Sequence, residues 1–189
     1  MVSGVYEHSK SMPFDEDAVL VERFMAGDDS AFHTLYEKYH DKVFAIARGI
    51  LLDSDEAADA VQEIFTLVYR KADRFDRRSR FSTWLFRIAV NRSIQQSRRV
   101  KYKRNQVSLN EALEHPAEES QEPIDEPAIA EAMSLLHPQD RAILTLFYWD
   151  ELSLHEIAES LGCSPNAAKT RLFRARERFK VHYEEANHA

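Results

Sequence analysis

The apolar residues of this chain recur at steps of three and four, the spacing that places them on one face of an α-helix. The longest such stripe covers residues 32–50, and a second covers residues 58–72. Every periodic segment of the chain has this helical spacing. Four glycines and six prolines among 189 residues are also few for a loop-rich or all-β protein. The sequence therefore predicts an all-α fold.

The helical stripes fill two stretches of the chain, which predicts two small helical domains. The first domain is expected over residues 15–104, after an N-terminal tail over residues 1–14. Its four helices are expected to begin near Asp15, Asp29, Asp53 and Ser82. Residues 105–127 hold three of the prolines and no sustained stripe, so a flexible acidic linker is expected there. The second domain is expected over residues 128–189.

Composition excludes several kinds of protein. No apolar run approaches the ~18 residues of a membrane-spanning helix, and the polar N-terminus lacks a secretory apolar core, so no membrane insertion is expected. The single cysteine, Cys163, excludes an internal disulfide framework and a multi-thiolate metal site. The eight histidines include no pair four residues apart. We therefore expect a cytoplasmic protein that holds no metal and no cofactor.

The net charge of −7 hides a strong segregation of charge. Residues 70–104 carry 13 basic and 2 acidic side chains, and residues 105–136 carry 8 acidic side chains and no basic one. Residues 164–180 carry six basic side chains and one acidic. A charge run is often only a solvated helix face, but an excess of +11 over 35 residues makes that interpretation less attractive. Two separate basic segments indicate local binding of a polyanion.

Residues 154–172 have the spacing of a helix-turn-helix. Ala158 is small where the two helices would cross, Gly162 supplies the turn, and Ser164 and Pro165 suit the start of the second helix. Such a unit places the N-terminal part of its second helix in the DNA major groove. The candidate DNA-contacting residues are Ser164, Asn166, Lys169, Thr170, Arg171, Arg174, Arg176 and Arg178, the last three better placed for phosphates. The alternative is a helical hairpin with a basic outer face.

Two further helix faces are candidates for binding. After Ser82, an aromatic, cations and amides recur at steps of three and four, in the order Trp84, Arg87, Asn91, Gln95 and Arg98. An aromatic platform beside a cationic track suits unpaired bases, although Trp84 alone fits a core aromatic equally well. On the preceding helix, the polar face opposite the apolar stripe consists of Asp59, Gln62, Glu63 and Thr66. This face is solvated surface by default, or a docking site for a basic partner.

Four strings of this sequence resemble the extracytoplasmic-function (ECF) sigma factors, the two-domain initiation subunits of bacterial RNA polymerase. They are DAVQEIF at residues 59–65, FSTWLFRIAVN at 81–91, LSLHEIA at 152–158 and TRLFRAR at 170–176. The resemblance covers about residues 15–104 and 128–182, which is nearly the whole chain.

The resemblance implies a role for each module. The helix at 59–65 would bind the clamp helices of core RNA polymerase through its polar face. The loop at 75–81 and the helix after it would read and melt the −10 promoter element as single-stranded DNA. The residues implied for that step are Phe75, Arg78, Arg80, Trp84, Arg87, Asn91, Gln95 and Arg98. The last helix would read the −35 element as double-stranded promoter DNA, and an anti-sigma factor is a further partner.

Two other classes of function remain as alternatives. A stand-alone helix-turn-helix regulator, binding an operator as a dimer, explains residues 137–182 but gives no role to the basic helix around Trp84. An enzyme is the third class. Asp59 and Glu63 lie one helical turn apart, yet no Gly-rich phosphate loop, nucleophile motif or metal-ligand spacing accompanies them. We therefore expect a transcription initiation factor without catalytic chemistry.

Overall fold

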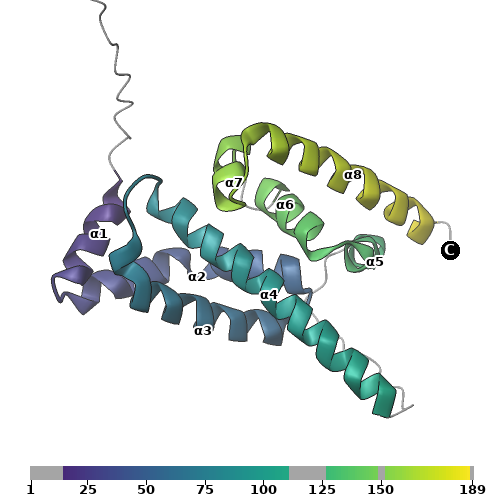
Figure 1. The fold of residues 1–189 in the computed structure, drawn as a ribbon, viewed down its shortest axis with the longest axis horizontal. Helices are drawn as coiled ribbons and strands as arrows, with labels where there is room; N and C mark the ends of the chain where they lie inside the picture. Colours follow the sequence, from purple (N-terminus) through teal and green to yellow (C-terminus); the bar gives the residue numbers. More distant parts are fainter. Residues whose placement is uncertain (1–14, 111–126, 149–151, 188–189) are drawn as a thin grey trace, which may run out of the picture.

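The predicted all-α architecture is confirmed by a computed structural model, which describes residues 15–110, 127–148 and 152–187. Within these residues there are eight α-helices, one short 3₁₀ helix and no β-strand (Figure 1). The elements are α1 (Glu16–Met25), α2 (Asp29–Leu51), α3 (Ser54–Lys71), η1 (Ala72–Arg74), α4 (Phe81–Asn110), α5 (Pro127–Leu135), α6 (Pro138–Tyr148), α7 (Leu154–Ser160) and α8 (Pro165–Asn187). The predicted tail over residues 1–14 lies outside the described residues.

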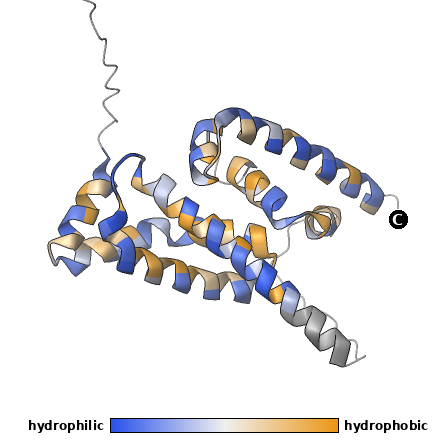
Figure 2. Ribbon diagram, in the orientation of Figure 1, coloured by the Kyte–Doolittle hydropathy of each residue, from blue (hydrophilic) through white to orange (hydrophobic). Residues whose placement is uncertain are grey.

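Helices α2, α3 and α4 pack side by side and form most of the first domain. The predicted apolar stripes face inward, so that Val43 and Ile46 of α2 and Val61 and Ile64 of α3 are buried. Figure 2 shows the apolar residues concentrated where these helices face one another. Asp28 and Asp53, at the N-cap positions of α2 and α3, accept hydrogen bonds from backbone N–H groups in the first turn of each helix. Of these two caps, the local sequence predicts the one at Asp53.

One carboxylate, that of Asp15, caps two helices. Its Oδ1 accepts from the backbone N–H of Asp17 in α1, and its Oδ2 accepts from the backbone N–H of Phe81 at the start of α4, 2.8 Å away. A helix capped by Ser82 would begin at Thr83, whereas α4 begins at Phe81. The prediction that Ser82 caps α4 is therefore wrong. The first N–H of α4 finds its acceptor 66 residues away in the chain, which no local pattern reveals.

A buried carboxylate fixes α1 against α2. Asp17 is only 6% exposed, and it accepts hydrogen bonds from the Tyr39 hydroxyl and the Lys38 ammonium, each at 2.5 Å. Burial, and then the hydrogen bond to Asp17, raises the pKa of Tyr39 well above its usual range. The phenol therefore stays a neutral donor, and α1 is held where Asp15 can reach α4.

Helix α4 extends through Asn110, six residues into the stretch predicted as linker. The described chain resumes at Pro127, the first residue of α5. Residues 111–126, which are most of the predicted acidic linker, lie outside the described residues. The domain boundaries at residues 104 and 128 stay predictions.

Helices α5 to α8 form the second domain, in which α5, α6 and α7 all pack against α8. The Ser153 and Glu156 side chains form the predicted capping box at the start of α7. Gly162 then turns the chain with a left-handed φ of +62°, a conformation that favours glycine. The Ser164 hydroxyl accepts from the Ala167 N–H, 3.2 Å away, at the start of α8. The structure thus contains the predicted helix-turn-helix.

The two domains pack against each other. Helix α6 lies against α2 and α4, and α7 lies against α4 (Figure 1). Buried apolar side chains of both domains form one continuous cluster, which includes Ile50 of α2 and Leu146 of α6. The sequence analysis did not predict this contact. Among the described helices, none is long and apolar enough to cross a membrane.

Candidate polymerase and nucleic-acid interface

Four polar side chains lie on the solvent-facing side of α3 and are called the α3 stripe below. They are Asp59, Gln62, Glu63 and Thr66, and all four are exposed. The Thr66 hydroxyl donates to the backbone carbonyl of Gln62 at 2.8 Å. Because the opposite face of α3 is buried, the structure brings the predicted residues together on one accessible face.

An aromatic side chain continues the α3 stripe toward the end of the helix. Tyr69 is 50% exposed, and its ring centroid lies 4.8 Å from that of Phe24 and 5.1 Å from that of Phe32. A rigid, half-exposed aromatic offers apolar contact area to a protein partner. Sequence reasoning missed Tyr69, although its three-residue step from Thr66 places it on the same side of the helix.

A second residue that sequence reasoning missed is Arg92 of α4. Its guanidinium forms an ion pair with Glu63 of the α3 stripe and also donates to the side-chain oxygen of Gln95, 2.8 Å away. The pair joins residues 29 positions apart, so the helical spacing of either segment gives no signal for it.

The predicted −10 residues on α4 form the α4 stripe, consisting of Trp84, Arg87, Asn91, Gln95 and Arg98. The last four are exposed, whereas Trp84 is partly buried. The Trp84 ring centroid lies 5.7 Å from that of Phe75 and 5.8 Å from that of Phe81. One side of Trp84 therefore packs on the domain core, and its role in binding unpaired bases stays a prediction. The far end of the stripe borders an open hollow of about 410 Å³, lined by Gln95, Arg98, Arg99 and Tyr102.

The predicted loop residues before α4 do not all join the α4 stripe. Phe75 is only 9% exposed and packs edge-on against Phe81, with ring centroids 5.6 Å apart. The structure thus places Phe75 in the core, where it supports Trp84, instead of on an exposed surface. Arg78 and Arg80 are exposed. Arg78 lies 3.2 Å from an Asp76 carboxylate oxygen, and Arg80 faces the second domain.

The candidate −35 residues of α8 are all exposed. They are Ser164, Asn166, Lys169, Thr170, Arg171, Arg174, Arg176 and Arg178. The four-residue steps from Asn166 to Thr170 and Arg174 place these three on one line of the helix. Lys169 and Arg171 lie on opposite flanks of that line, because each residue turns the helix by about 100°. The arrangement offers amide and hydroxyl groups in the centre and cations on both sides.

Two of the α8 arginines are held by α6. The Arg178 Nη1 lies 2.7 Å from the Oδ2 of Asp140, a residue that is itself 8% exposed. The Arg176 guanidinium lies over the rings of Phe147 and Tyr148, 4.6 Å and 5.2 Å from their centroids. These contacts fix the two cations near the edges of α8, where they suit the phosphates that flank a groove.

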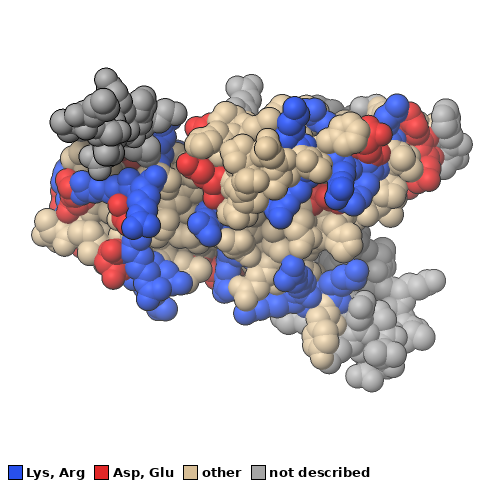
Figure 3. Space-filling view, turned by 45° about the horizontal axis from the view of Figure 1, so that its top comes forward, with Lys and Arg blue, Asp and Glu red and all other residues tan. Residues whose placement is uncertain are grey.

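Basic side chains form two groups on the face of the molecule seen in Figure 3. Figure 3 shows Lys and Arg over α8 and again along α4. Among the described residues, no group of three or more His, Cys, Asp or Glu side chains is arranged to hold a metal ion.

Solved structures with a similar fold are known. CnrH, in a complex with the cytosolic domain of CnrY, superposes with a TM-score of 0.68 over 90% of this chain and 99% of CnrH. The sequence identity is 23%, so this likeness concerns the fold. The sigma factor RpoE, in a complex with the anti-sigma factor NepR from Bartonella quintana, gives a TM-score of 0.63 at 25% identity. It covers 81% of this chain and 96% of RpoE.

Sequence relatives and family models agree with the fold. The ECF sigma-E factor of Escherichia coli K12 is 35% identical over 179 residues, covering 85% of this chain and 91% of its own length. The ECF sigma factor SigW of Bacillus subtilis is 33% identical over 170 residues, covering 83% and 91%. The model of Sigma-70 region 2 matches residues 35–102, and that of Sigma-70, region 4 matches residues 127–179. The chain belongs to the ECF sigma factors of bacterial RNA polymerase.

Proposed function

We propose that this sigma factor directs core RNA polymerase to promoters through three separate surfaces: the α3 stripe, the α4 stripe and α8. The observation that supports this most is the presence of two different DNA-binding chemistries on one chain. The α4 stripe combines an aromatic with cations and amides, as single strands require, while α8 belongs to a helix-turn-helix that suits duplex DNA. A stand-alone regulator would use only the second.

The α3 stripe is proposed as the contact with core polymerase. Its two carboxylates, at Asp59 and Glu63, are exposed, and the half-exposed ring of Tyr69 lies further along the same helix. A polar patch with an aromatic at its edge fits a basic protein surface, because charge complementarity orients the encounter and the ring supplies buried apolar area.

The α4 stripe is proposed to stabilise the melted −10 element. Unstacking a base step costs a few kcal/mol, and a protein without ATP must offset this by contacts made only to the open strand. Stacking of one base on an aromatic contributes about 1–3 kcal/mol, which is of the required size. Trp84 is positioned by Phe75 and Phe81 behind it, and Asn91 lies two helical turns along the same stripe.

Helix α8 is proposed to read the −35 element in the major groove. Asn166, Lys169 and Arg171 lie in its first two turns, where such a helix reaches base edges. Arg174, Arg176 and Arg178 follow in the next turns and suit phosphates. The chain is proposed to act in the cytoplasm, without catalytic chemistry, and to bind an anti-sigma factor, as RpoE does in its complex with NepR.

Run-off transcription tests the proposed function. Purified core polymerase, incubated with this chain and a library of bacterial genomic fragments, should start transcripts at a small set of related sequences that core polymerase alone does not use. The start sites should share two motifs at a fixed separation. A protein that shifts a palindromic duplex without polymerase, and that adds no start sites, would instead be a stand-alone regulator.

A further inference from the structure

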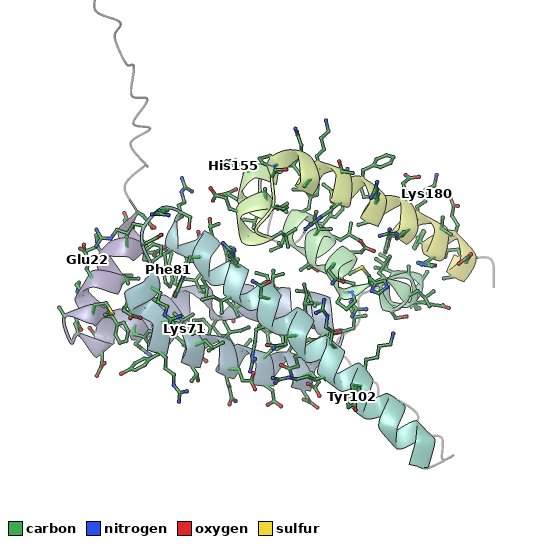
Figure 4. The ribbon with its side chains drawn as sticks, viewed as in Figure 1. Glu22, Lys71, Phe81, Tyr102, His155 and Lys180 are labelled. Atoms are coloured by element: carbon green, nitrogen blue, oxygen red, sulfur yellow. The ribbon has the colours of Figure 1, made fainter. Side chains whose placement is uncertain are left out.

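The 75–81 loop, which leads into the α4 stripe, is attached to α1 at two points. At its C-terminal end, the backbone N–H of Phe81 donates to the Oδ2 of Asp15, 2.8 Å away. In its middle, the Arg77 guanidinium forms an ion pair with the Glu22 carboxylate. Figure 4 shows Glu22 of α1 and Phe81 of α4 at the same end of the first domain. Helix α1 therefore holds the loop, a role that its own sequence does not reveal.

The backbone of Arg77 has a conformation that its side chain disfavours. Its φ is +59°, in the left-handed region that glycine and asparagine adopt more readily. An arginine stays in this region only where neighbouring contacts hold it. One such contact is local, because the Arg78 N–H donates to the Oδ1 of Asp76 at 3.1 Å. The ion pair with Glu22 is the other, and it fixes the bend of the loop from outside.

This bend lies beside Trp84. Phe75, the first residue of the loop, packs against Trp84 and Phe81, with ring centroids 5.7 Å and 5.6 Å away. The loop therefore starts and ends at the aromatic group that supports Trp84, and Arg78 is exposed between the two ends. A base stacked on the open side of Trp84 would have this loop as its neighbour.

Discrimination between bases requires such a neighbour to be fixed. A contact favours one base over another only when its donors and acceptors are held within about 0.5 Å of one geometry. A loop that moves freely meets every base about equally well, although its cations still attract the phosphates. An anchor that never touches DNA can therefore change the base preference and leave the general attraction for DNA unchanged.

The exposure of the Glu22–Arg77 pair fits a local role better than a role in the stability of the whole domain. The side chains of Glu22 and Arg77 are 53% and 54% exposed. Ion pairs between such exposed groups contribute little to global stability. The free energy that moves one loop is far smaller than the free energy that unfolds the protein, so a weak pair is sufficient to bias the loop.

We propose that Glu22 of α1 is a positioning residue for reading the −10 element. By pairing with Arg77, it fixes the 75–81 loop beside Trp84 and so sets the base preference at that point, without touching DNA itself. The inference rests on the proposed function of the α4 stripe. Removal of the Glu22 carboxylate leaves every cation of the loop in place and releases only the bend between them.

Limited proteolysis of the full chain tests whether Glu22 holds the loop. Glu22→Gln removes the charge and keeps the size of the side chain. Glu16→Gln makes the same change at another exposed residue of α1 and is the matched control. Trypsin cleaves after arginine where the segment can unfold locally. Cleavage after Arg77, Arg78 or Arg80, identified by mass spectrometry of the first fragments, should be several-fold faster in Glu22→Gln than in wild type or Glu16→Gln.

Run-off transcription with core polymerase then tests base reading. The template is a promoter found with the fragment library, in which one −10 base at a time is replaced. The ratio of transcripts from the original and the replaced template measures base preference, and a general loss of folded protein cancels in it. A wrong base typically costs about five-fold or more. Glu22→Gln should lower this ratio toward one at a −10 position and leave it unchanged for a replaced −35 base, while Glu22→Asp, which keeps the carboxylate, should retain most of the preference.

Two results would overturn the proposal. The first is equal loop cleavage in Glu22→Gln and Glu16→Gln, which would show that Glu22 does not hold the loop. The second is an unchanged preference at every −10 position in a Glu22→Gln chain whose loop is cleaved faster, which would separate the loop from base reading. Failure of the proposed function looks different, because the wild-type chain itself would then start no transcripts with core polymerase.

Discussion

Arg92 of α4 forms an ion pair with Glu63 of α3, in which the Arg92 Nε lies 2.6 Å from the Glu63 Oε2. The same guanidinium donates from Nη1 to the Oε1 of Gln95 at 2.8 Å. One side chain therefore connects the proposed polymerase contact with the proposed −10 contact. A cation of the polymerase that pairs with Glu63 would release Arg92 beside the α4 stripe, where a DNA phosphate is the natural new partner.

Charge reversal of the α3 stripe should weaken polymerase binding. The double variant Asp59→Lys/Glu63→Lys is expected to lower the affinity for core polymerase about ten-fold or more, because it places cations against a basic partner. Its free energy of unfolding should fall by only about 1 kcal/mol, mainly through loss of the Glu63–Arg92 ion pair, because ion pairs at the surface contribute little. Affinity is measured by competition with a labelled sigma factor, and unchanged affinity would contradict the assignment.

The internal ion pair supplies the control for that experiment. Arg92→Gln removes the partner of Glu63 and leaves the α3 stripe intact. It should leave polymerase affinity equal or slightly higher, because the competing guanidinium is gone. Should Arg92→Gln weaken binding as much as the charge reversal does, Glu63 acts through its internal pair and not by touching the polymerase.

The α4 stripe should act in strand opening and not in the first capture of DNA. Asn91→Ala is expected to leave closed-complex binding nearly normal while reducing permanganate-reactive open complex. Trp84→Ala should do the same, with an additional loss of stability because the ring packs on Phe75 and Phe81. A template with a pre-melted −10 bubble should partly rescue both. Loss of closed-duplex affinity without rescue by the bubble would make Trp84 a core aromatic only.

We expect different residues of α8 to contact the bases and the phosphates of the −35 element. Asn166→Ala, Lys169→Ala or Arg171→Ala should each cost about 1–3 kcal/mol and relax preference at one base pair of the −35 element. Arg174→Ala should weaken all sequences alike and flatten the salt dependence. Arg178→Ala is a poorer control, because it would leave the buried carboxylate of Asp140 without this cation. Equal effects of both classes on all sequences would show that α8 does not discriminate bases.

Tyr39 should make the protein sensitive to alkaline pH. Its pKa is raised above the ordinary 10.0 in the folded state, so its contribution to stability is present below about pH 10. That contribution is lost as the pH rises further, because the phenol of the unfolded chain ionises first. Urea unfolding at about pH 8 and about pH 10.5 should show a smaller advantage of wild type over Tyr39→Phe at the higher pH. An advantage that does not shrink would contradict the proposed role of the neutral phenol.

Much of the fold follows from local sequence. The apolar stripes place α2 and α3, Asp53 caps α3 through the N–H of Glu56, and the capping box of Ser153 and Glu156 starts α7. These signals work because the interacting groups lie within one or two helical turns. For the same reason, the exposed members of the α3 stripe, the α4 stripe and α8 can be named from helical spacing alone.

The remaining features depend on residues that are distant in the sequence. Phe75 belongs to the core because α4 folds back over it, and α4 starts at Phe81 because Asp15 reaches its first N–H.

The sequence by itself determined that this protein is all helical, that it has two domains and which helix faces carry charge, because helical periodicity and capping act over a few residues. Only the tertiary structure decided that Gly49 packs directly against Thr145 and that Arg141 donates to the Ile50 carbonyl at the end of α2. It also decided that Gly162, in the turn before α8, lies against Arg87 of the α4 stripe. Those contacts join helices from different domains. Their free energy depends on the shape of two assembled surfaces, which no local pattern in the chain encodes.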